Sequence, residues 1–286
     1  MRSEKQMYDL ILNTAKGDDR IRAVSMCGSR CDPNAPKDEY QDYDIEYVVR
    51  DIKSFTQDHN WIRVFGNPIM VQMPELYEGA TGSGCFVYLM LFSDWNRIDL
   101  TLIPIEKCDE MAEYSSLDRV LLDKDGIMPK LPPTDDSHYH IKPPTAMQYD
   151  GYCNNFWWVM QNVSKGIMRD ELPYAMKMLD YSRYCLEKIM ECKIGIDYDF
   201  KVAAGKLGKY YKKYLSAGEF EDYRSTYPSA DYGSIWQAMF AMCGIFPPYA
   251  QYVAQKMGFE YRDDYEKNMM KYLKEMKKRY DDNILP

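Results

Sequence analysis

Five prolines between residues 129 and 144 divide this 286-residue sequence into two halves with different hydrophobic periodicity. Before them, short apolar runs of strand length alternate with a few helical patterns, and after them apolar residues recur at three- and four-residue steps. Proline interrupts both helices and sheets, so this stretch predicts a connector. We therefore predict an α+β fold, with a mixed sheet and flanking helices in residues 1–135 and a helical bundle in residues 136–286.

The first half predicts a helix followed by strands. Residues 4–16 place Met7, Leu10, Ile11 and Ala15 on one helical face. Apolar runs bounded by turn residues predict strands in the rest of this half. The expected strands are residues 21–27, 42–49, 61–65, 69–74, 86–92 and 96–103.

The second half is expected to be helical. Its apolar residues follow the helical period over long stretches, and Pro173 falls in the first turn of one of them, where its missing N–H costs nothing. The expected helices are residues 152–168, 171–192, 232–243, 248–257 and 263–280.

Three aspartates are the strongest chemical signal in the sequence. Asp42 and Asp44 lie two residues apart at the start of a predicted strand, so both fall on the same face. Asp99 interrupts an otherwise apolar strand, where a buried unpaired carboxylate is expensive. Three converging carboxylates need cations between them, and oxygen ligands suit Mg²⁺. Gly28-Ser29, at the end of the preceding strand, leaves room for a phosphate near the backbone. An Asp-x-Asp pair without these other features would be a common surface pattern.

Composition argues against several other classes of protein. The net charge of −8 leaves no basic face for nucleic acid, and the Lys271–Arg279 run fits a solvated helix face. No stretch approaches the ~20 apolar residues of a membrane span. Eight cysteines without a regular framework favour reduced thiols in the cytoplasm. His138 and His140 are only weak evidence for a zinc site, because zinc sites use three or four protein ligands.

Short segments spread over nearly the whole chain carry a family pattern. Gly28-Ser29 followed by Asp42-x-Asp44 matches the signature of the nucleotidyltransferase superfamily related to DNA polymerase beta. Together with the other segments, it resembles the aminoglycoside 6-adenylyltransferases, the streptomycin-modifying group. The segments are Gly28-Ser29-Arg30, Tyr40 to Ile45, Tyr88 to Phe92, Ile98 to Leu102, Leu121 to Asp125, Pro144-Thr145-Ala146, Asn154 to Trp157, Lys165-Gly166, Arg169 and Ile235-Trp236.

The resemblance implies a reaction and an organisation. Such enzymes transfer AMP from ATP to a hydroxyl of the aminoglycoside and release pyrophosphate. Residues 1–135 would be the nucleotidyltransferase domain and residues 136–286 the helical substrate-binding domain, with the site in the cleft. Asp42 and Asp44 would bind the metal, and Asp99 would bind it too or accept the proton of the attacking hydroxyl.

The resemblance also implies a nucleotide site. Ser29 and the backbone around Gly28 would hold the triphosphate, and Arg30 would clamp it, because a guanidinium matches phosphate oxygens. A second set of basic residues would reach the triphosphate from the helical domain, although such residues on their own would be read as a solvated helix face. This set is Lys165, Arg169 and Lys206.

The candidate acceptor residues are Asn155, Trp157 and Asp180. Asn155 stands where glutamate is expected in the family, and Cys27 stands where the family is expected to have glutamate before Gly28. A cationic antibiotic needs carboxylates around it, so Asn155 leaves the acceptor open. Trp157 and Trp158 either stack on an acceptor or pack between the domains. Asp180 either lines an acidic pocket or belongs to a surface ion-pair ladder.

The leading interpretation is an aminoglycoside adenylyltransferase, with streptomycin as the expected acceptor. The expected partners are ATP and a cationic aminoglycoside, with no nucleic acid and no membrane, and the expected assembly is a monomer or a weak homodimer. One alternative keeps the chemistry and changes the acceptor to another hydroxylated small molecule or a protein. Another is a non-catalytic nucleotide-binding or antitoxin-like protein, against which the intact set of three carboxylates argues.

Overall fold

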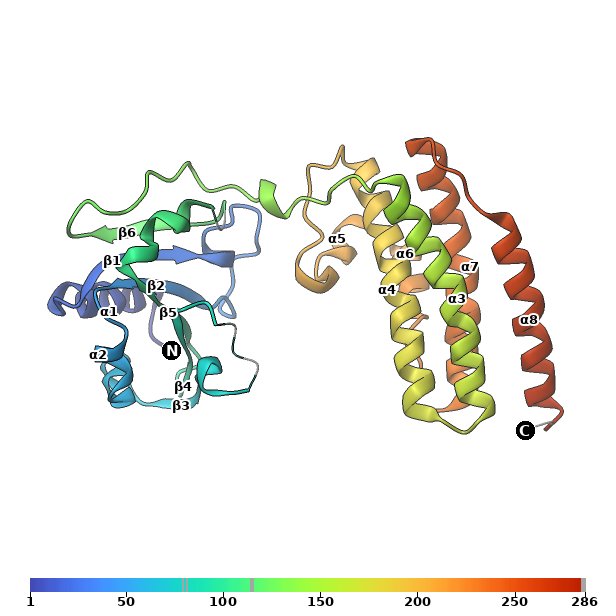
Figure 1. The fold of residues 1–286 in the computed structure, drawn as a ribbon, viewed down its shortest axis with the longest axis horizontal. Coiled ribbons are helices and arrows are strands. Elements are labelled where there is room, and N and C mark those ends of the chain that lie inside the picture. The colour runs from blue at the N-terminus through green and yellow to red at the C-terminus, as the bar shows by residue number, and fades with distance from the viewer. Residues whose placement is uncertain (79, 81, 114–115, 284–286) are drawn as a thin grey trace. The chain divides into compact units, whose positions relative to one another are not determined.

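The computed structural model describes residues 1–78, 80, 82–113 and 116–283, and the chain divides into two compact units, Met1–His138 and Tyr139–Pro286 (Figure 1). The division falls inside the proline-rich connector, close to position 135. The first unit is built on a sheet and the second is helical, so the predicted α+β class is confirmed.

A six-stranded mixed sheet forms the first unit. Its strand order is β3-β4-β5-β2-β1-β6. The β2–β5 pair is parallel and the other four pairs are antiparallel. The strands are β1 (Ile21–Cys27), β2 (Tyr43–Val49), β3 (Pro68–Gln72), β4 (Phe86–Phe92), β5 (Arg97–Pro104) and β6 (Arg119–Asp123).

Helices of the first unit are short except for α1 (Glu4–Gly17). The Ser3 side chain accepts a hydrogen bond from the Gln6 backbone, and the Gln6 side chain accepts one from the Ser3 backbone. This capping box satisfies two N–H groups at the helix start. The remaining helical segments are α2 (Lys53–Thr56) and the 3₁₀ segments Gly28–Arg30, His59–Phe65, Pro74–Leu76, Ile105–Glu113 and Ser137–Tyr139.

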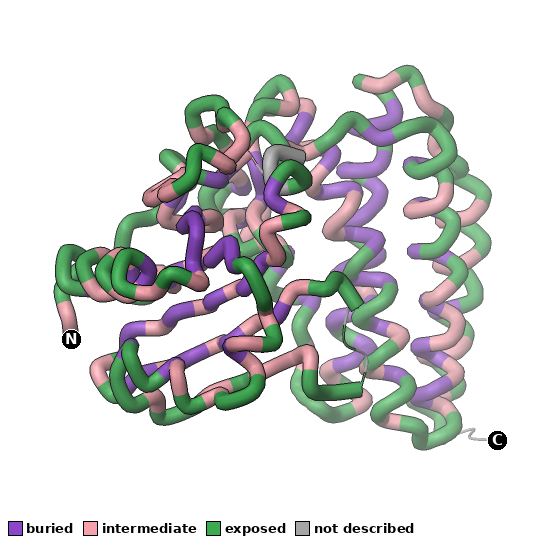
Figure 2. Tube along the Cα trace, turned by 60° about the vertical axis from the view of Figure 1, so that its left-hand side comes forward, coloured by how far each residue is buried: buried purple, intermediate pink, exposed green. Residues whose placement is uncertain are grey.

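The two faces of β2 have different surroundings. Ile45, Tyr47 and Val49 are buried in a core that includes Met7 and Ile11 of α1. The opposite face carries Asp44 and Glu46, which are partly exposed. Figure 2 shows buried and partly buried positions alternating along strands of the sheet. Successive side chains of a strand point to opposite faces, so the apolar positions that attach β2 to α1 also place the acidic residues on the other side.

Residues 61–65 are a 3₁₀ segment, and the prediction of a strand there is wrong. Asp58 caps the segment by accepting a hydrogen bond from the Asn60 backbone. Ile62 and Phe65, three residues apart, are its buried positions, and this spacing is that of a 3₁₀ turn rather than of a strand. Strand β6 was not expected, and β2 begins at Tyr43, one residue later than predicted.

Four long helices and two short ones make up the second unit. Thr145 caps α3 through a capping box with Gln148, which begins the helix earlier than predicted. Within the described part of the chain, no helix combines the length and apolarity needed to cross a membrane. The helices are α3 (Ala146–Met168), α4 (Leu172–Asp197), α5 (Tyr211–Tyr214), α6 (Ala217–Arg224), α7 (Tyr232–Met257) and α8 (Asp263–Asp281).

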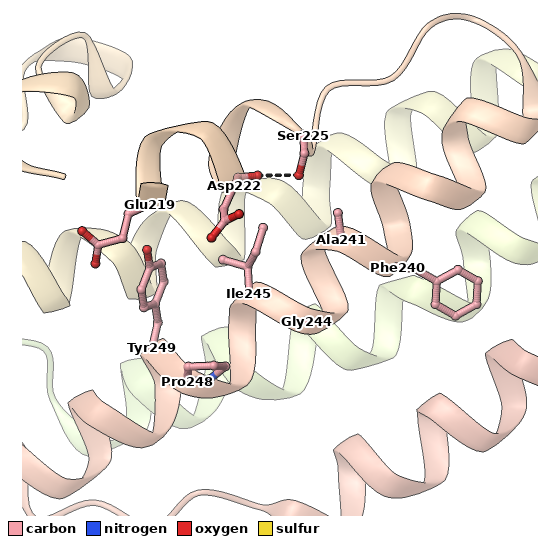
Figure 3. Close-up of a pocket in the computed structure, with 9 residues that line it drawn as sticks. All are labelled: Glu219, Asp222, Ser225, Phe240, Ala241, Gly244, Ile245, Pro248 and Tyr249. Carbon is pink, nitrogen blue, oxygen red and sulfur yellow. Dashed lines mark hydrogen bonds between the residues drawn. The ribbon is translucent and has the colours of Figure 1, made fainter. Parts of the chain in front are cut away.

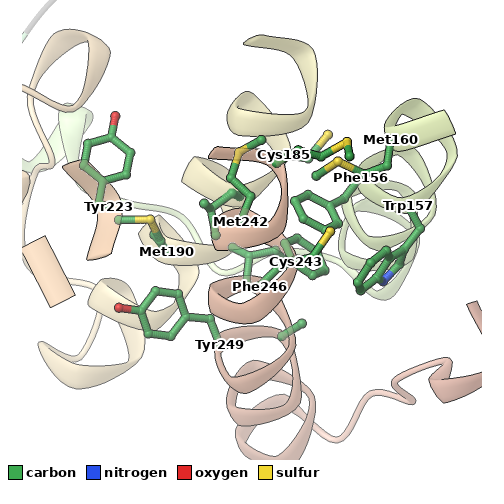
Figure 4. Close-up of a cluster of buried hydrophobic side chains, with 14 of the residues drawn as sticks. Phe156, Trp157, Met160, Cys185, Met190, Tyr223, Met242, Cys243, Phe246 and Tyr249 are labelled. Carbon is green, nitrogen blue, oxygen red and sulfur yellow. The ribbon is translucent and has the colours of Figure 1, made fainter. Parts of the chain in front are cut away.

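Aromatic residues form the centre of the helical core (Figure 4). The rings of Phe156 in α3 and Phe246 in α7 stack with their centroids 3.8 Å apart and their planes 7° from parallel. Trp157 meets Phe246 edge-on at 6.1 Å and is only 2% exposed. Burying side chains of this size is worth several kcal/mol each, so the helical unit has a core of its own.

Helix α7 is continuous through Pro247 and Pro248, although the sequence predicted two helices there. Each proline removes one hydrogen bond to the carbonyl four residues earlier, at Cys243 and Gly244. The neighbours of the prolines compensate, because Phe246 and Ala250 are fully buried in the core. Packing therefore outweighs the local breaking signal.

Candidate functional site

The parallel pairing of β2 with β5 brings the predicted carboxylates together. Asp44 is the register partner of Asp99 in β5 and of Cys27 in β1. Asp42 immediately precedes β2. Neighbouring strands lie about 4.8 Å apart, so Asp44 and Asp99 lie side by side on the acidic face of the sheet.

Arg97 is a member of this cluster that the sequence analysis missed. Its Nε and one terminal nitrogen donate to the two oxygens of Asp99 at 2.7 and 2.6 Å, and the other terminal nitrogen lies 3.5 Å from Asp42 Oδ2. Arg97 and Asp99 are two positions apart in a strand, so their side chains lie on the same face. That spacing was the available signal.

Burial and mutual repulsion dominate the electrostatics of the carboxylates. Burial, followed by the charges of Asp99 and Asp42, raises the pKa of Asp44 to about 6. Burial also raises the pKa of Asp42, against the opposing effect of Arg97. Within residues 1–78, 80, 82–113 and 116–283, no group of three or more His, Cys, Asp or Glu side chains has the arrangement of a metal site. The oxygen donor set nevertheless fits a divalent cation by its chemistry.

Gly28 is required by its contact with Asp44. Its φ is +73°, and a Cβ at this position would lie 2.2 Å from Asp44 Oδ2. Both the backbone conformation and the space exclude a larger residue. The absence of a side chain at Gly28 therefore provides the space that the Asp44 carboxylate occupies.

Arg30 and Gln41 hold the loop between β1 and β2. The Arg30 guanidinium donates to the backbone oxygens of Asp42 at 2.9 Å and Gln41 at 2.8 Å, and it stacks over Tyr43. The Gln41 amide donates to the Ser29 carbonyl oxygen at 3.0 Å. Arg30, which was predicted to clamp phosphate, thus fixes the position of Asp42 in this structure.

A second group of acids lies on the same face. Ser25 Oγ donates to Glu46 at 2.6 Å, and burial raises the pKa of Glu46. Asp118 is 6% exposed, and burial followed by the charge of Glu46 raises its pKa to about 7. Burial also raises the pKa of the Cys27 thiol. Charges on this face are therefore costly to the fold.

The remaining predicted residues lie in the helical unit. Asn155 is exposed and Lys165 is partly exposed, and the spacing places both on one face of α3 together with Trp158. Arg169 is exposed and follows α3 as its C-cap. Lys206 is exposed in a 3₁₀ segment.

Trp157 and Asp180 have surroundings that bear on their predicted roles. Trp157 is buried in the helical core, which favours packing over stacking on an acceptor, and Trp158 is its exposed neighbour. Asp180 is ion-paired with Arg183, which also donates to the Thr226 carbonyl oxygen. This pair favours the ion-pair alternative for Asp180.

One pocket of about 380 Å³ lies between α6 and α7 (Figure 3). The predicted site residues of the helical unit do not line it. Glu219, on its wall, is already paired with Lys193 at 3.0 Å. The chemistry is therefore better located at the sheet carboxylates than at this pocket. Its lining residues are Glu219, Asp222, Ser225, Phe240, Ala241, Gly244, Ile245, Pro248 and Tyr249.

Replacing Gly28 with alanine should disable the site. The added methyl group collides with Asp44 and strains the backbone, so we expect a loss of stability of about 1–3 kcal/mol and a loss of most activity. Urea denaturation and a pyrophosphate-release assay measure the two effects. Gly17→Ala is the matched control, because a Cβ there meets nothing within 4 Å. Equal behaviour of the two variants would contradict this account.

Replacing Asp118 with asparagine should stabilise the protein more at pH 8 than at pH 5. The folded pKa of about 7 exceeds the ordinary value of 3.8, so the wild type loses stability as the pH rises between these values. Asparagine cannot ionise, and the gain should grow by about 1–3 kcal/mol between pH 5 and pH 8, at about 1.36 kcal/mol per pKa unit.

Urea denaturation at the two pH values tests this expectation. Asp125→Asn is the control, because Arg22 lowers the pKa of Asp125. The effect of that substitution should therefore be the same at pH 5 and at pH 8. If the gain in unfolding free energy for Asp118→Asn is the same at both pH values, ionisation of Asp118 does not destabilise the folded protein.

Comparison with known proteins gives a consistent family. The sequence profile of the streptomycin adenylyltransferases matches residues 1–276. An aminoglycoside 6-adenylyltransferase of Bacillus subtilis is 39% identical, over 95% of this chain and 97% of the relative. One of Campylobacter jejuni is 39% identical, over 99% of this chain and 100% of the relative. A crystal structure of an aminoglycoside 6-adenyltransferase from Bacillus subtilis aligns with a TM-score of 0.48 at 35% identity, covering 96% and 99% of the two chains.

The profile and the full-length identities confirm the predicted enzyme class, an aminoglycoside nucleotidyltransferase. The chain belongs to the streptomycin adenylyltransferase family.

Proposed function

We propose that this protein transfers AMP from Mg-ATP to a hydroxyl of an aminoglycoside, with streptomycin as the leading acceptor, and releases pyrophosphate. The observation that carries the proposal is the pairing of Asp44 with Asp99 across β2 and β5, with Asp42 linked to the same cluster through Arg97. The aminoglycoside acceptor is taken from relatives that are 39% identical over almost their whole length.

Asp42, Asp44 and Asp99 are the proposed metal-binding residues. Their oxygens are hard ligands. Burial, followed by the charges of Asp99 and Asp42, raises the pKa of Asp44. When bound, Mg²⁺ would neutralise the triphosphate and the departing pyrophosphate. A site of this kind binds metal with its carboxylates ionised, so the metal must offset the cost of charging Asp44.

Nucleotide binding is proposed for Ser29, the backbone at Gly28, and basic residues of the helical unit. The positive φ of Gly28 keeps side-chain atoms away from the backbone next to Asp44, which leaves that backbone accessible. Arg30 contributes by holding the carbonyl of Asp42. Lys165, Arg169 and Lys206 are exposed or partly exposed, and we propose that they contact the phosphates.

In the proposed reaction, the acceptor hydroxyl oxygen attacks the α-phosphorus of ATP. A new P–O bond forms, the bond to the bridging oxygen of the β-phosphate breaks, and pyrophosphate leaves with that bonding pair. The hydroxyl proton passes to a carboxylate of the cluster, for which Asp99 is the candidate. Asp99 is the candidate because it is the register partner of Asp44 in the neighbouring strand and its side chain is 19% exposed.

Acceptor binding is assigned to the helical unit. Asn155 and Trp158 are exposed and three residues apart on α3, so a cationic ring system could pack against the indole beside the amide. Asn155 carries no charge, and this favours a second candidate acceptor, another hydroxylated molecule with fewer cationic groups. We further propose that the enzyme acts in the cytoplasm as a monomer or a weak homodimer.

The reaction is tested by a pyrophosphate-release assay with ATP, Mg²⁺ and a panel of aminoglycosides. The wild type should release pyrophosphate with at least one member, and Asp44→Asn should lower kcat by at least about a thousandfold, because it removes a metal ligand. Asp125→Asn is the matched control, since it removes a carboxylate of the same unit outside the cluster. No release with any aminoglycoside would refute the proposed acceptor class, and full activity of Asp44→Asn would refute the site.

The role of Asn155 is tested by substitution with glutamate. A carboxylate at this exposed position should lower the KM for streptomycin by about tenfold while leaving the KM for ATP unchanged, because a charge-assisted hydrogen bond contributes about 1.5–3 kcal/mol. Asn154→Glu, at the adjacent exposed position, is the control for a general charge effect. An unchanged KM for streptomycin would remove Asn155 from the acceptor site.

A further inference from the structure

We propose that Arg97 is the counter-ion of the carboxylate cluster in the metal-free protein. Its guanidinium pairs with Asp99 and Asp42 until a divalent metal ion displaces the guanidinium. The inference rests on the proposed function, because it takes these aspartates as metal ligands. It adds a residue that sets how tightly the site binds metal.

The contacts of Arg97 cover the oxygens that a metal would use. Its bidentate pair with Asp99 occupies both carboxylate oxygens, at 2.7 and 2.6 Å, and its third nitrogen lies 3.5 Å from Asp42. A bidentate arginine–carboxylate pair is among the stronger charged hydrogen bonds. The guanidinium and a metal ion therefore compete for the same oxygens.

Arg97 differs from the other paired arginines of the sheet unit. Arg2, Arg20 and Arg22 each pair with an aspartate and also donate to a backbone carbonyl oxygen, which anchors the guanidinium in the fold. Within the described residues, the hydrogen bonds and ion pairs of the Arg97 guanidinium go to Asp99 and Asp42. Displacing it would therefore break no such bond to a backbone carbonyl oxygen, in contrast to the other three arginines.

Exposure allows the displacement. The Arg97 side chain is 42% exposed, and an arginine on the first residue of a strand can turn its long side chain to water at little cost. The pairing also explains how the cluster is tolerated before metal binds, because three neighbouring carboxylates otherwise repel one another. Arg97 thus stabilises the metal-free protein and weakens metal binding.

The test is Arg97→Met in the full chain, measured without nucleotide at pH 8. The metal-free melting temperature should fall, whereas the affinity for Mn²⁺ alone, measured by calorimetry, should rise by about tenfold, a typical size for the coupling between two binding events. Opposite signs are the signature of competition. A purely structural residue would lower stability without tightening metal binding.

Arg22→Met is the matched control. It breaks a bidentate pair with Asp125 in the same sheet, and it should lower the melting temperature while leaving the Mn²⁺ affinity unchanged. Arg97→Lys keeps the charge, loses the fork and retains the wild-type fold, so its Mn²⁺ affinity should fall between those of the wild type and Arg97→Met.

The outcomes separate the inference from the proposed function. If the wild type binds Mn²⁺ and Arg97→Met binds it no more tightly, the counter-cation role is wrong and the metal site stands. If neither protein binds Mn²⁺, the metal assignment itself fails and the counter-cation role fails with it. Tighter binding by Arg97→Met, with Arg97→Lys between it and the wild type, supports the proposal.

Discussion

The parallel pairing of β2 with β5 is the constraint on which the proposed catalytic site depends. It sets Asp44 beside Asp99, at the spacing of neighbouring strands, where two carboxylates repel each other. The apolar faces of the same strands are buried against α1, so the register cannot shift by one residue without exposing that core. Burial of hydrophobic side chains on one face thus maintains an unfavourable arrangement of charges on the other. This is the usual relation between a stable scaffold and a strained site.

Three local features make the arrangement tolerable. Gly28 has no side chain where the Asp44 carboxylate stands, and Arg30 ties the loop before β2 to the backbone of Asp42. Arg97 places a positive charge between Asp99 and Asp42. Gly28 acts through its backbone conformation, and Arg30 acts through hydrogen bonds to backbone oxygens, whereas Arg97 pairs with side chains. The charge balance is accordingly the part of the site that can change when a ligand binds.

Sequence patterns predicted those parts of the fold in which local and tertiary preferences agree. The alternation along β2 and the acidic Asp44 were readable because burial follows the strand period. The predicted strand at residues 61–65 and the predicted interruption of the helix between residues 243 and 248 were both wrong, because tertiary packing decided the structure there. The burial of Trp157 beside an exposed Trp158 depends on which face of α3 meets α7. Arg97 could have been found from its spacing to Asp99, whereas the contacts of Arg30 with the loop required coordinates.

The two units differ in how freely their functional residues can vary. Asp44 cannot be changed without affecting Gly28 and Asp99, because the three occupy one small volume of the sheet. Asn155 is exposed on α3, and exposed helix positions usually alter stability by no more than about 0.5 kcal/mol. The stacked rings of Phe156 and Phe246 hold that helix from its other side. Exposed residues of a helix anchored in this way can be substituted without unfolding it. Such substitutions would change the acceptor specificity that we assign to this helix, while the proposed carboxylate site on the sheet stays the same.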